Sequence, residues 1–222
     1  MGGRGAYRAG QDRDKLIDWL SVGSGTGSSV VHPMDISKFK DWSLEQVEDR
    51  LRNLAHEELF VLDKNNKVIK AYRGDSNSVA FNASDLDIAD ATVTHGHPKG
   101  AAEFGGTFFA DVNNMLNSKW SEHRATVSGQ GEMNYIMRAT NKANPQGLRN
   151  KINSDFQGLR SSVSKKYDSE YAKSIKSGTT EKQARHNARQ QSVGILNRYY
   201  KDTFSQYGYE YITRKENYSY GR

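Results

Sequence analysis

The sequence predicts a layered α/β or α+β domain that carries a basic helical extension at its C-terminal end. Strand-like and helix-like segments interleave between about 43 and 140, which is typical of a sheet covered by helices. From residue 149 to residue 222 the periodicity is helical, with 15 Lys or Arg against 7 Asp or Glu, whereas the preceding residues hold 17 and 19. Only 35% of the chain is hydrophobic, so we expect the core to occupy part of it.

These shifts in composition predict three regions. Residues 1–40 are rich in Gly and Ser, as in "SVGSGTGSSV", and predict a flexible arm with one short helix at "DRDKLIDWL". Residues 41–145 contain the mixed helix and strand pattern of the layered domain. Residues 146–222 form the basic, tyrosine-rich extension.

The layered domain begins with an amphipathic helix and a hairpin. Residues 43–55 place apolar side chains at helical spacing after a capping box of Ser43 and Gln46. In residues 57–74, two apolar runs flank the turn-forming "DKNN", a pattern that indicates a β-hairpin.

Further strands and one short helix follow the hairpin. "SVAF" at 78–81 predicts a third strand or strand end, and 91–97 predicts a strand that Pro98 closes because proline cannot continue the hydrogen-bond ladder. "ADVNNMLNSK" at 110–119 reads as a short helix. Residues 123–140 read as a second hairpin.

The extension predicts two helices joined near Gly178. The second has a capping box of Thr180 with Gln183 and ends at Gly208. Nine of the twelve tyrosines of the chain lie in this extension, interleaved with Lys and Arg.

Two interpretations of the basic extension stay open. Basic side chains neutralise phosphates and tyrosines stack on exposed bases, so the extension could contact nucleic acid or a partner protein. The residues expected at such a contact are Lys165, Lys166, Arg185, Arg189, Tyr199 and Tyr200. Alternatively the two helices are solvated on one side, and their tyrosines pack on the layered domain or on a partner.

The absence of cysteine excludes disulfides, thiolate zinc sites and cysteine nucleophiles, so any metal needs His, Asp or Glu ligands. The N-terminal sequence "MGGRGAYRAG" lacks an apolar signal segment, and no apolar run approaches a membrane span. These features predict no secretion by a signal peptide, no membrane span, and a cytoplasmic location.

The segment "VTHGHPKG" places two histidines on one strand. Residues two apart on a strand point to the same face, so His95 and His97 can bind one ion, while Gly96 leaves the opposite face clear. A zinc site needs a third protein ligand, and Asp111 can supply it from the first turn of the next helix. The remaining histidines, including His123 and His186, are expected at the surface.

A hydrolytic zinc site also needs a general base that does not bind the metal. Glu57 and Glu58 open the first strand of the hairpin, and either acid, on a strand beside the histidine strand, would project over the site. The sequence leaves open which of the two does so.

This arrangement resembles the JAMM (MPN-type) zinc metallopeptidases and their RadC-like branch, in which an upstream Glu precedes H-x-H-x7-S-x2-D. The likeness covers roughly residues 55–140, through "HEELFVLDKNNKVIKAYRG", "VTHGHPKG" and "TFFADV". It implies a JAMM-like (cytidine-deaminase-like) layered sheet with flanking helices and one zinc ion. In this resemblance His95, His97 and Asp111 are the ligands, and Glu57, or Glu58 in the alternative register, is the catalytic base.

Two departures from the family pattern bear on activity. Phe108 stands in the position of the serine that stabilises the oxyanion, and Thr107 lies one residue out of register with it. The interval from His97 to Asp111 is also longer than the pattern by about three residues. The resemblance therefore implies either an active zinc-dependent peptidase or isopeptidase, or a degenerate site that keeps the metal.

The start "MGGRG" and the segment after Asp111 resemble proteins of phages and prophages of Gram-positive bacteria. That resemblance implies a location in the bacterial host cytoplasm, in the virion, or in both. The alternative function is therefore a non-enzymatic virion component, such as a minor head, inner-core or ejected protein, whose basic extension contacts DNA or capsid and portal subunits.

Overall fold

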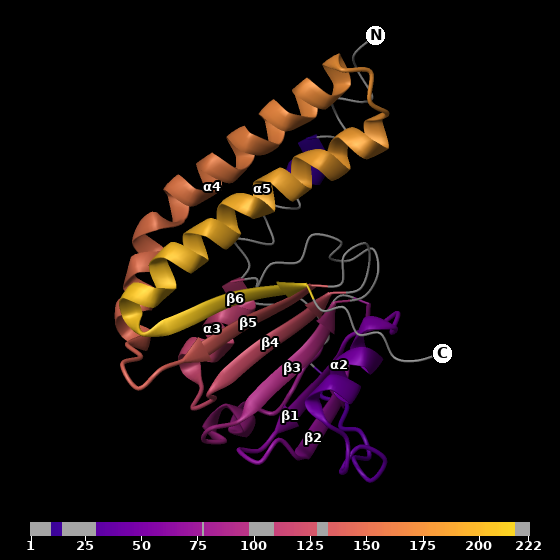
Figure 1. Ribbon diagram of the computed structural model, residues 1–222, viewed down its shortest axis with the longest axis vertical. Helices are drawn as coiled ribbons and strands as arrows, with labels where there is room; N and C mark the ends of the chain where they lie inside the picture. The colour runs from indigo at the N-terminus through magenta and orange to yellow at the C-terminus, as the bar shows by residue number, and fades with distance from the viewer. Residues whose placement is uncertain (1–9, 15–29, 77, 98–108, 128–132, 216–222) are drawn as a thin grey trace.

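A computed structural model describes residues 10–14, 30–76, 78–97, 109–127 and 133–215 (Figure 1). Six strands form one mixed sheet with helices on both faces, which confirms the predicted α/β class. The strands are β1 (Glu58–Leu62), β2 (Val68–Arg73), β3 (Thr92–His97), β4 (Glu122–Val127), β5 (Met133–Ala139) and β6 (Tyr209–Lys215). The helices are α2 (Leu44–Arg52), α3 (Phe109–Asn117), α4 (Pro145–Lys176) and α5 (Glu181–Phe204), with short 3-10 helices η1 (Ala83–Asp87) and η2 (Ser205–Tyr207).

The strand order is β2-β1-β3-β4-β5-β6. Both predicted hairpins form, β1 with β2 and β4 with β5, and each is antiparallel. Of these neighbouring pairs only β3 and β4 run parallel. They can do so because α3, which lies between them in the chain, provides the crossover that parallel strands need. The histidine strand β3 therefore lies between β1 and β4, in the interior of the sheet.

Side chains of β1 alternate between two hydrophobic cores, one on each face of the sheet. Leu59 and Val61 belong to the larger core, which α3, α4 and α5 cover. Phe60 and Leu62 belong to a smaller core beneath α2. All five residues of β1 are buried, as expected for a strand with helices on both sides.

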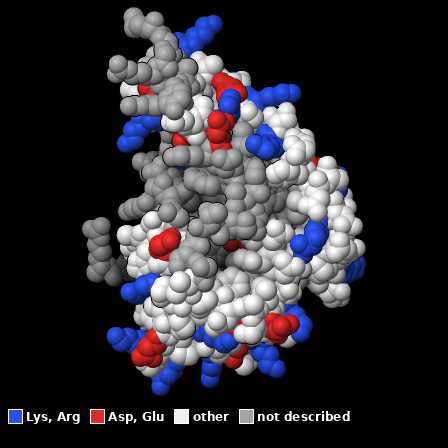
Figure 2. Space-filling model, turned by 180° about the vertical axis from the view of Figure 1, so that it is seen from behind, with Lys and Arg blue, Asp and Glu red and all other residues white. Residues whose placement is uncertain are grey.

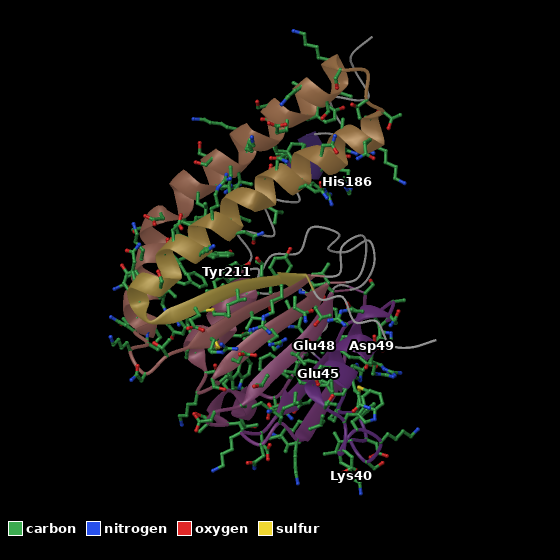
Figure 3. All side chains as sticks on the ribbon, in the orientation of Figure 1. Lys40, Glu45, Glu48, Asp49, His186 and Tyr211 are labelled. Carbon is green, nitrogen blue, oxygen red and sulfur yellow. The ribbon has the colours of Figure 1, made fainter. Side chains whose placement is uncertain are left out.

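Helix α2 begins at the predicted capping box, in which Ser43 and Gln46 satisfy each other's backbone N–H groups. Its sheet-facing side also carries charge, because Glu48 accepts hydrogen bonds from Arg124 on β4 (2.5 Å) and from Asn134 on β5 (2.7 Å). Figure 3 shows Glu48 on α2 beside the sheet. Since all three side chains are buried, these polar contacts fix the position of α2 over β3 and β4.

Two predictions for the N-terminal half are wrong. Residues 30–40 do not form part of a flexible arm, because Pro33 bridges to Tyr72 of β2 and Phe39 is buried in the smaller core. "SVAF" at 78–81 forms no strand, and residues 32–34 instead lie along β2, where the Met34 N–H donates to the Ala71 carbonyl and the Arg73 N–H to the His32 carbonyl. Residues 10–14 are helical and overlap the predicted helix at 12–14, whose remaining residues, 15–20, lie outside the described residues.

The extension forms the two predicted helices, which turn at Gly178 with a positive φ of 83°. Figure 1 shows the α4/α5 hairpin rising from the β6 side of the sheet and projecting beyond it. Strand β6, which was not predicted from the sequence, pairs with β5 over its whole length. The predicted regions 41–145 and 146–222 therefore contribute to the same sheet and to the same hydrophobic core.

Tyr199 and Tyr200, two tyrosines expected at a nucleic-acid contact, make their contacts within the protein. Tyr200 is fully buried between α5 and β6, with its ring 5.2 Å from that of Tyr211, so its expected role in stacking on bases is wrong. The Tyr199 hydroxyl donates a hydrogen bond to Asp155 of α4 (3.0 Å). The packing interpretation is therefore the correct one for these two side chains.

Most of the basic residues expected at a nucleic-acid contact are engaged within the chain. Lys166 and Arg185 pair with glutamates four positions away on their own helices, at 3.0 and 2.5 Å. Arg189 binds Asp12 of the N-terminal segment (Nε to Oδ2, 2.8 Å), whereas Lys165 is exposed. Figure 2 shows acidic and basic side chains interspersed on the face drawn, without a continuous basic surface.

Among the described residues, no helix combines the length and the apolar character that crossing a membrane requires. The longest, α4, carries charged residues along its length.

Candidate metal centre

The end of β3 brings the two predicted histidines to one face of the sheet. His95 pairs with Leu59 of β1 and with Ala125 of β4, and all three residues face the larger core. His97, two positions later, shares that face, and both imidazoles are buried. The small side chain of Ala125 leaves room for the His95 ring beside it.

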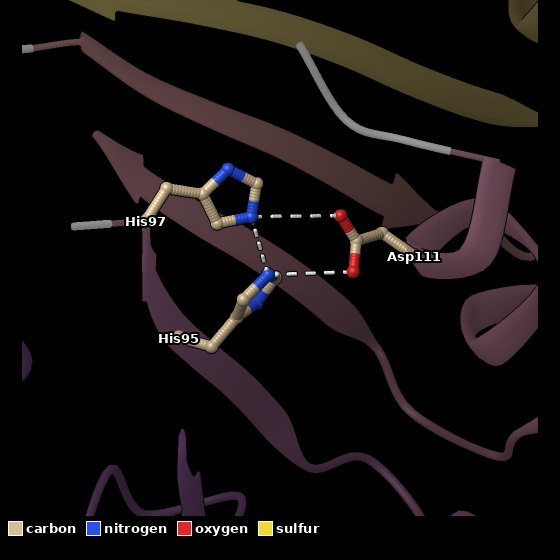
Figure 4. Close-up of side chains that lie close together, drawn as sticks. All are labelled: His95, His97 and Asp111. Atoms are coloured by element: carbon tan, nitrogen blue, oxygen red, sulfur yellow. Dashed lines mark hydrogen bonds and ion pairs between the residues drawn. The ribbon is translucent and has the colours of Figure 1, made fainter. Parts of the chain in front are cut away.

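Helix α3 supplies the third side chain from its first turn, as the sequence predicts. Asp111 Oδ1 lies 3.3 Å from His95 Nε2, and Asp111 Oδ2 lies 3.9 Å from His97 Nε2. The two Nε2 atoms are 2.9 Å apart. Figure 4 shows all three side chains pointing toward one another from β3 and α3.

These three groups fit a metal ion. Two imidazole nitrogens and a carboxylate oxygen are common zinc ligands, and two ligands ~2.1 Å from a tetrahedral ion are about 3.4 Å apart. The observed separations of 2.9 to 3.9 Å bracket that value, and the three ligand atoms lie within 4.8 Å of one another. The buried His95, His97 and Asp111 could therefore hold one metal ion.

Burial keeps the two histidines in the state that binds metal. It lowers the pKa of His95 to about 4, against a smaller opposing effect of a hydrogen bond with the Arg124 backbone. Burial, followed by the nearby charges of His95 and His123, lowers the pKa of His97 well below its ordinary value. Both rings are thus neutral near pH 7, with lone pairs available to an ion.

Glu57 lies on the same face as the histidines. It directly precedes β1 and continues the pairing with β2, since its N–H donates to Asp75 and its carbonyl accepts from Gly74. Strand alternation then directs its side chain to the side of Leu59, which pairs with His95. Burial, followed by the negative charges of Asp111 and Asp75, raises the pKa of Glu57 to about 8.

Glu58 points to the opposite face of the sheet, toward α2. Its fully buried carboxylate accepts hydrogen bonds from Arg50 (2.7 Å) and from His56 (3.0 Å). Burial raises the pKa of Glu58, but those hydrogen bonds outweigh it, and the net pKa is lowered. Of the two acids, Glu57 is therefore the one on the face that carries the histidine–aspartate cluster.

His123 is a component of the site that sequence reasoning missed. The prediction that it lies at the surface is wrong, because β4 directs it into the larger core, where it is 3% exposed. Its Nδ1 lies 3.0 Å from the backbone carbonyl of Asp111, and its ring centroid lies 5.2 Å from that of His95. The alternation of β4 was the signal, since His123 shares the parity of the core residues Ala125 and Val127.

No protein-family model, curated protein or solved structure matches the chain. Phe108, which the resemblance places at the position of the family serine, and its neighbour Thr107 lie outside the described residues.

Gly96 separates the two histidines and faces α2. A Cβ at this position would lie 3.1 Å from both Cβ and the carbonyl oxygen of Leu51, closer than ordinary van der Waals contact. We expect Gly96→Ala to lower the free energy of unfolding by about 1–3 kcal/mol through overpacking, measured by urea denaturation. Gly158→Ala on α4 is the control, because nothing lies within 4 Å of its Cβ and helix propensity favours alanine. Equal stability of the Gly96 variant and the parent would contradict this packing.

The stability of the metal-free protein should fall as the pH rises from about 6.5 to 8. Glu57 has a raised pKa, so in this pH range the folded state binds a proton that the unfolded state has lost. The free energy of unfolding therefore falls by up to about 1.4 kcal/mol for each unit of rising pH. The buried histidines have lowered pKa values and act in the opposite direction, but only below about pH 6.5.

Urea denaturation with chelator at several pH values measures this slope. The Glu57→Gln variant should flatten it above pH 6.5, because glutamine does not titrate. An equal slope in parent and variant would show that another group is responsible.

Proposed function

We propose that the protein is a zinc-dependent peptidase or isopeptidase with a JAMM-like catalytic domain. The observation that carries this proposal is the buried cluster of His95, His97 and Asp111, with the carboxyl group of Glu57 on the same face. The order of these residues along the chain, an acid before the first strand, two histidines on β3 and an aspartate on α3, supports the JAMM-like assignment.

His95 Nε2, His97 Nε2 and one oxygen of Asp111 would hold the zinc ion, which leaves a fourth position for water or substrate. When bound, zinc activates water and polarises a substrate carbonyl. Glu57 would accept a proton from the attacking water and return it to the leaving amine. Its raised pKa suits this exchange, because a carboxyl group that titrates near neutral pH can both accept and donate the proton.

The direct test combines metal content with hydrolysis. The full-length protein, purified without chelator and reconstituted with zinc, should contain one zinc ion per chain by elemental analysis and should cleave quenched-fluorescent peptides or isopeptides. A folded protein that binds no zinc would contradict the proposal. One zinc ion per chain without cleavage would instead favour the degenerate metal-binding form that the position of Phe108 leaves open.

A further inference from the structure

The hydrogen bond between His123 and Asp111 connects the metal-ligand helix to the sheet. A carbonyl oxygen can only accept, so His123 Nδ1 must carry the proton that it shares with the Asp111 backbone over 3.0 Å. Asp111 accepts this hydrogen bond through its main-chain carbonyl and contributes its side-chain carboxylate to the cluster. The bond therefore restrains the backbone from which that carboxylate extends.

His123 is itself held on three sides. In the parallel pairing of β3 with β4 it lies opposite Val93, two residues before His95. Its ring packs at 5.2 Å from the ring of His95 and at 5.3 Å from that of Trp120, measured between centroids. A side chain so confined in a close-packed core provides a rigid anchor for α3.

We infer that His123 is a positioning residue for the metal centre. Through its Nδ1–H it holds the first turn of α3, and thus Asp111, at the distance from His95 and His97 that a shared ion requires. This inference rests on the proposed zinc site and assigns to it a partner outside the ligand set. Loss of such supporting hydrogen bonds typically weakens metal binding by about 10–100-fold.

Two substitutions separate the hydrogen bond from simple packing. His123→Phe keeps an aromatic ring against Trp120 but has no donor. His123→Asn loses the ring but keeps an N–H at nearly the position of Nδ1. We expect the Phe variant to bind Co²⁺ and Zn²⁺ about 10–100-fold more weakly than the parent, with an altered Co²⁺ absorption spectrum, and the Asn variant to recover most of the affinity.

The measurements are Co²⁺ titration by absorbance, Zn²⁺ competition, and melting temperature in chelator to compare the metal-free folds. Parent affinity in the Phe variant, or an Asn variant that is folded but as weak as the Phe variant, would overturn the inference. A parent protein that binds neither Co²⁺ nor Zn²⁺ would refute the proposed zinc site itself. Failure of the inference about His123 alone is seen only in the variants, while the parent still binds both ions.

NMR provides a measurement that does not depend on whether the variants fold. In the parent protein, ¹⁵N-correlated spectra of the imidazoles should show His123 protonated at Nδ1. A His123 ring protonated only at Nε2 would overturn the inference.

Discussion

Replacing His97 with alanine is expected to abolish stoichiometric zinc binding. Zinc affinities in small structural sites correspond to roughly 10–16 kcal/mol over four ligands, so one lost ligand costs about 2.5–4 kcal/mol, or ~10²–10³-fold in the dissociation constant. The remaining pair, His95 and Asp111, separated by 3.3 Å, cannot close a site on its own. Elemental analysis and competition with a zinc chelator of known affinity measure the loss.

The matched control is His186→Ala. Figure 3 places His186 on the projecting part of α5, away from the sheet that carries the cluster. This variant should keep one zinc ion per chain and the affinity of the parent. Melting temperatures in chelator show whether either variant has lost its fold. Full zinc content in the folded His97 variant would refute the assignment of the ligand.

Replacing Glu57 with glutamine is expected to lower the rate of hydrolysis by about 10²–10⁴-fold while zinc content stays at one ion per chain. Glutamine has nearly the same shape as glutamate but cannot accept a proton at neutral pH. Because Glu57 is not one of the three clustered ligand groups, the variant separates catalysis from metal binding. The measurement is kcat on the cleaved peptide, together with zinc analysis of the same sample.

Glu58→Gln tests the neighbouring carboxyl group. Its partners Arg50 and His56 lie on the α2 side of the sheet, so we expect a less stable protein whose folded fraction retains its kcat. If this variant loses catalysis and Glu57→Gln does not, the assignment of the two acids is reversed.

The strand period was sufficient to predict the core of the site. Two histidines on a strand with one residue between them must share a face, and a helix that follows the strand can bring a carboxylate of its first turn to them. The strand period could not decide between Glu57 and Glu58. Adjacent residues point to opposite faces of the sheet, and the sequence does not show which residue of β1 pairs with which residue of β3. The pairing of Leu59 with His95 settles the face of each side chain.

The hydrogen-bond partner of His123 and the position of β6 could not be predicted from local patterns. The alternation of β4 indicates that His123 shares a face with Ala125 and Val127, but its hydrogen bond to a main-chain carbonyl leaves no trace in the sequence. "YEYITRK" alternates as a strand should, but it follows two long helices, and nothing local indicates that it returns to β5. The association with phage particles and with protein substrates stays a prediction from the sequence.

The return of β6 to β5 has a consequence for the order of folding. Ala139 pairs with Tyr209 although some seventy residues separate them, a contact that an unstructured chain would close slowly. The α4/α5 hairpin is local and can form early, and it brings its two ends together, where the Asn144 N–H donates to the Tyr207 carbonyl. Once the hairpin exists, the loop that β6 must close is only a few residues long. The α4/α5 hairpin thus brings β6 to β5, so that β6 and not β5 is the edge strand on this side of the sheet.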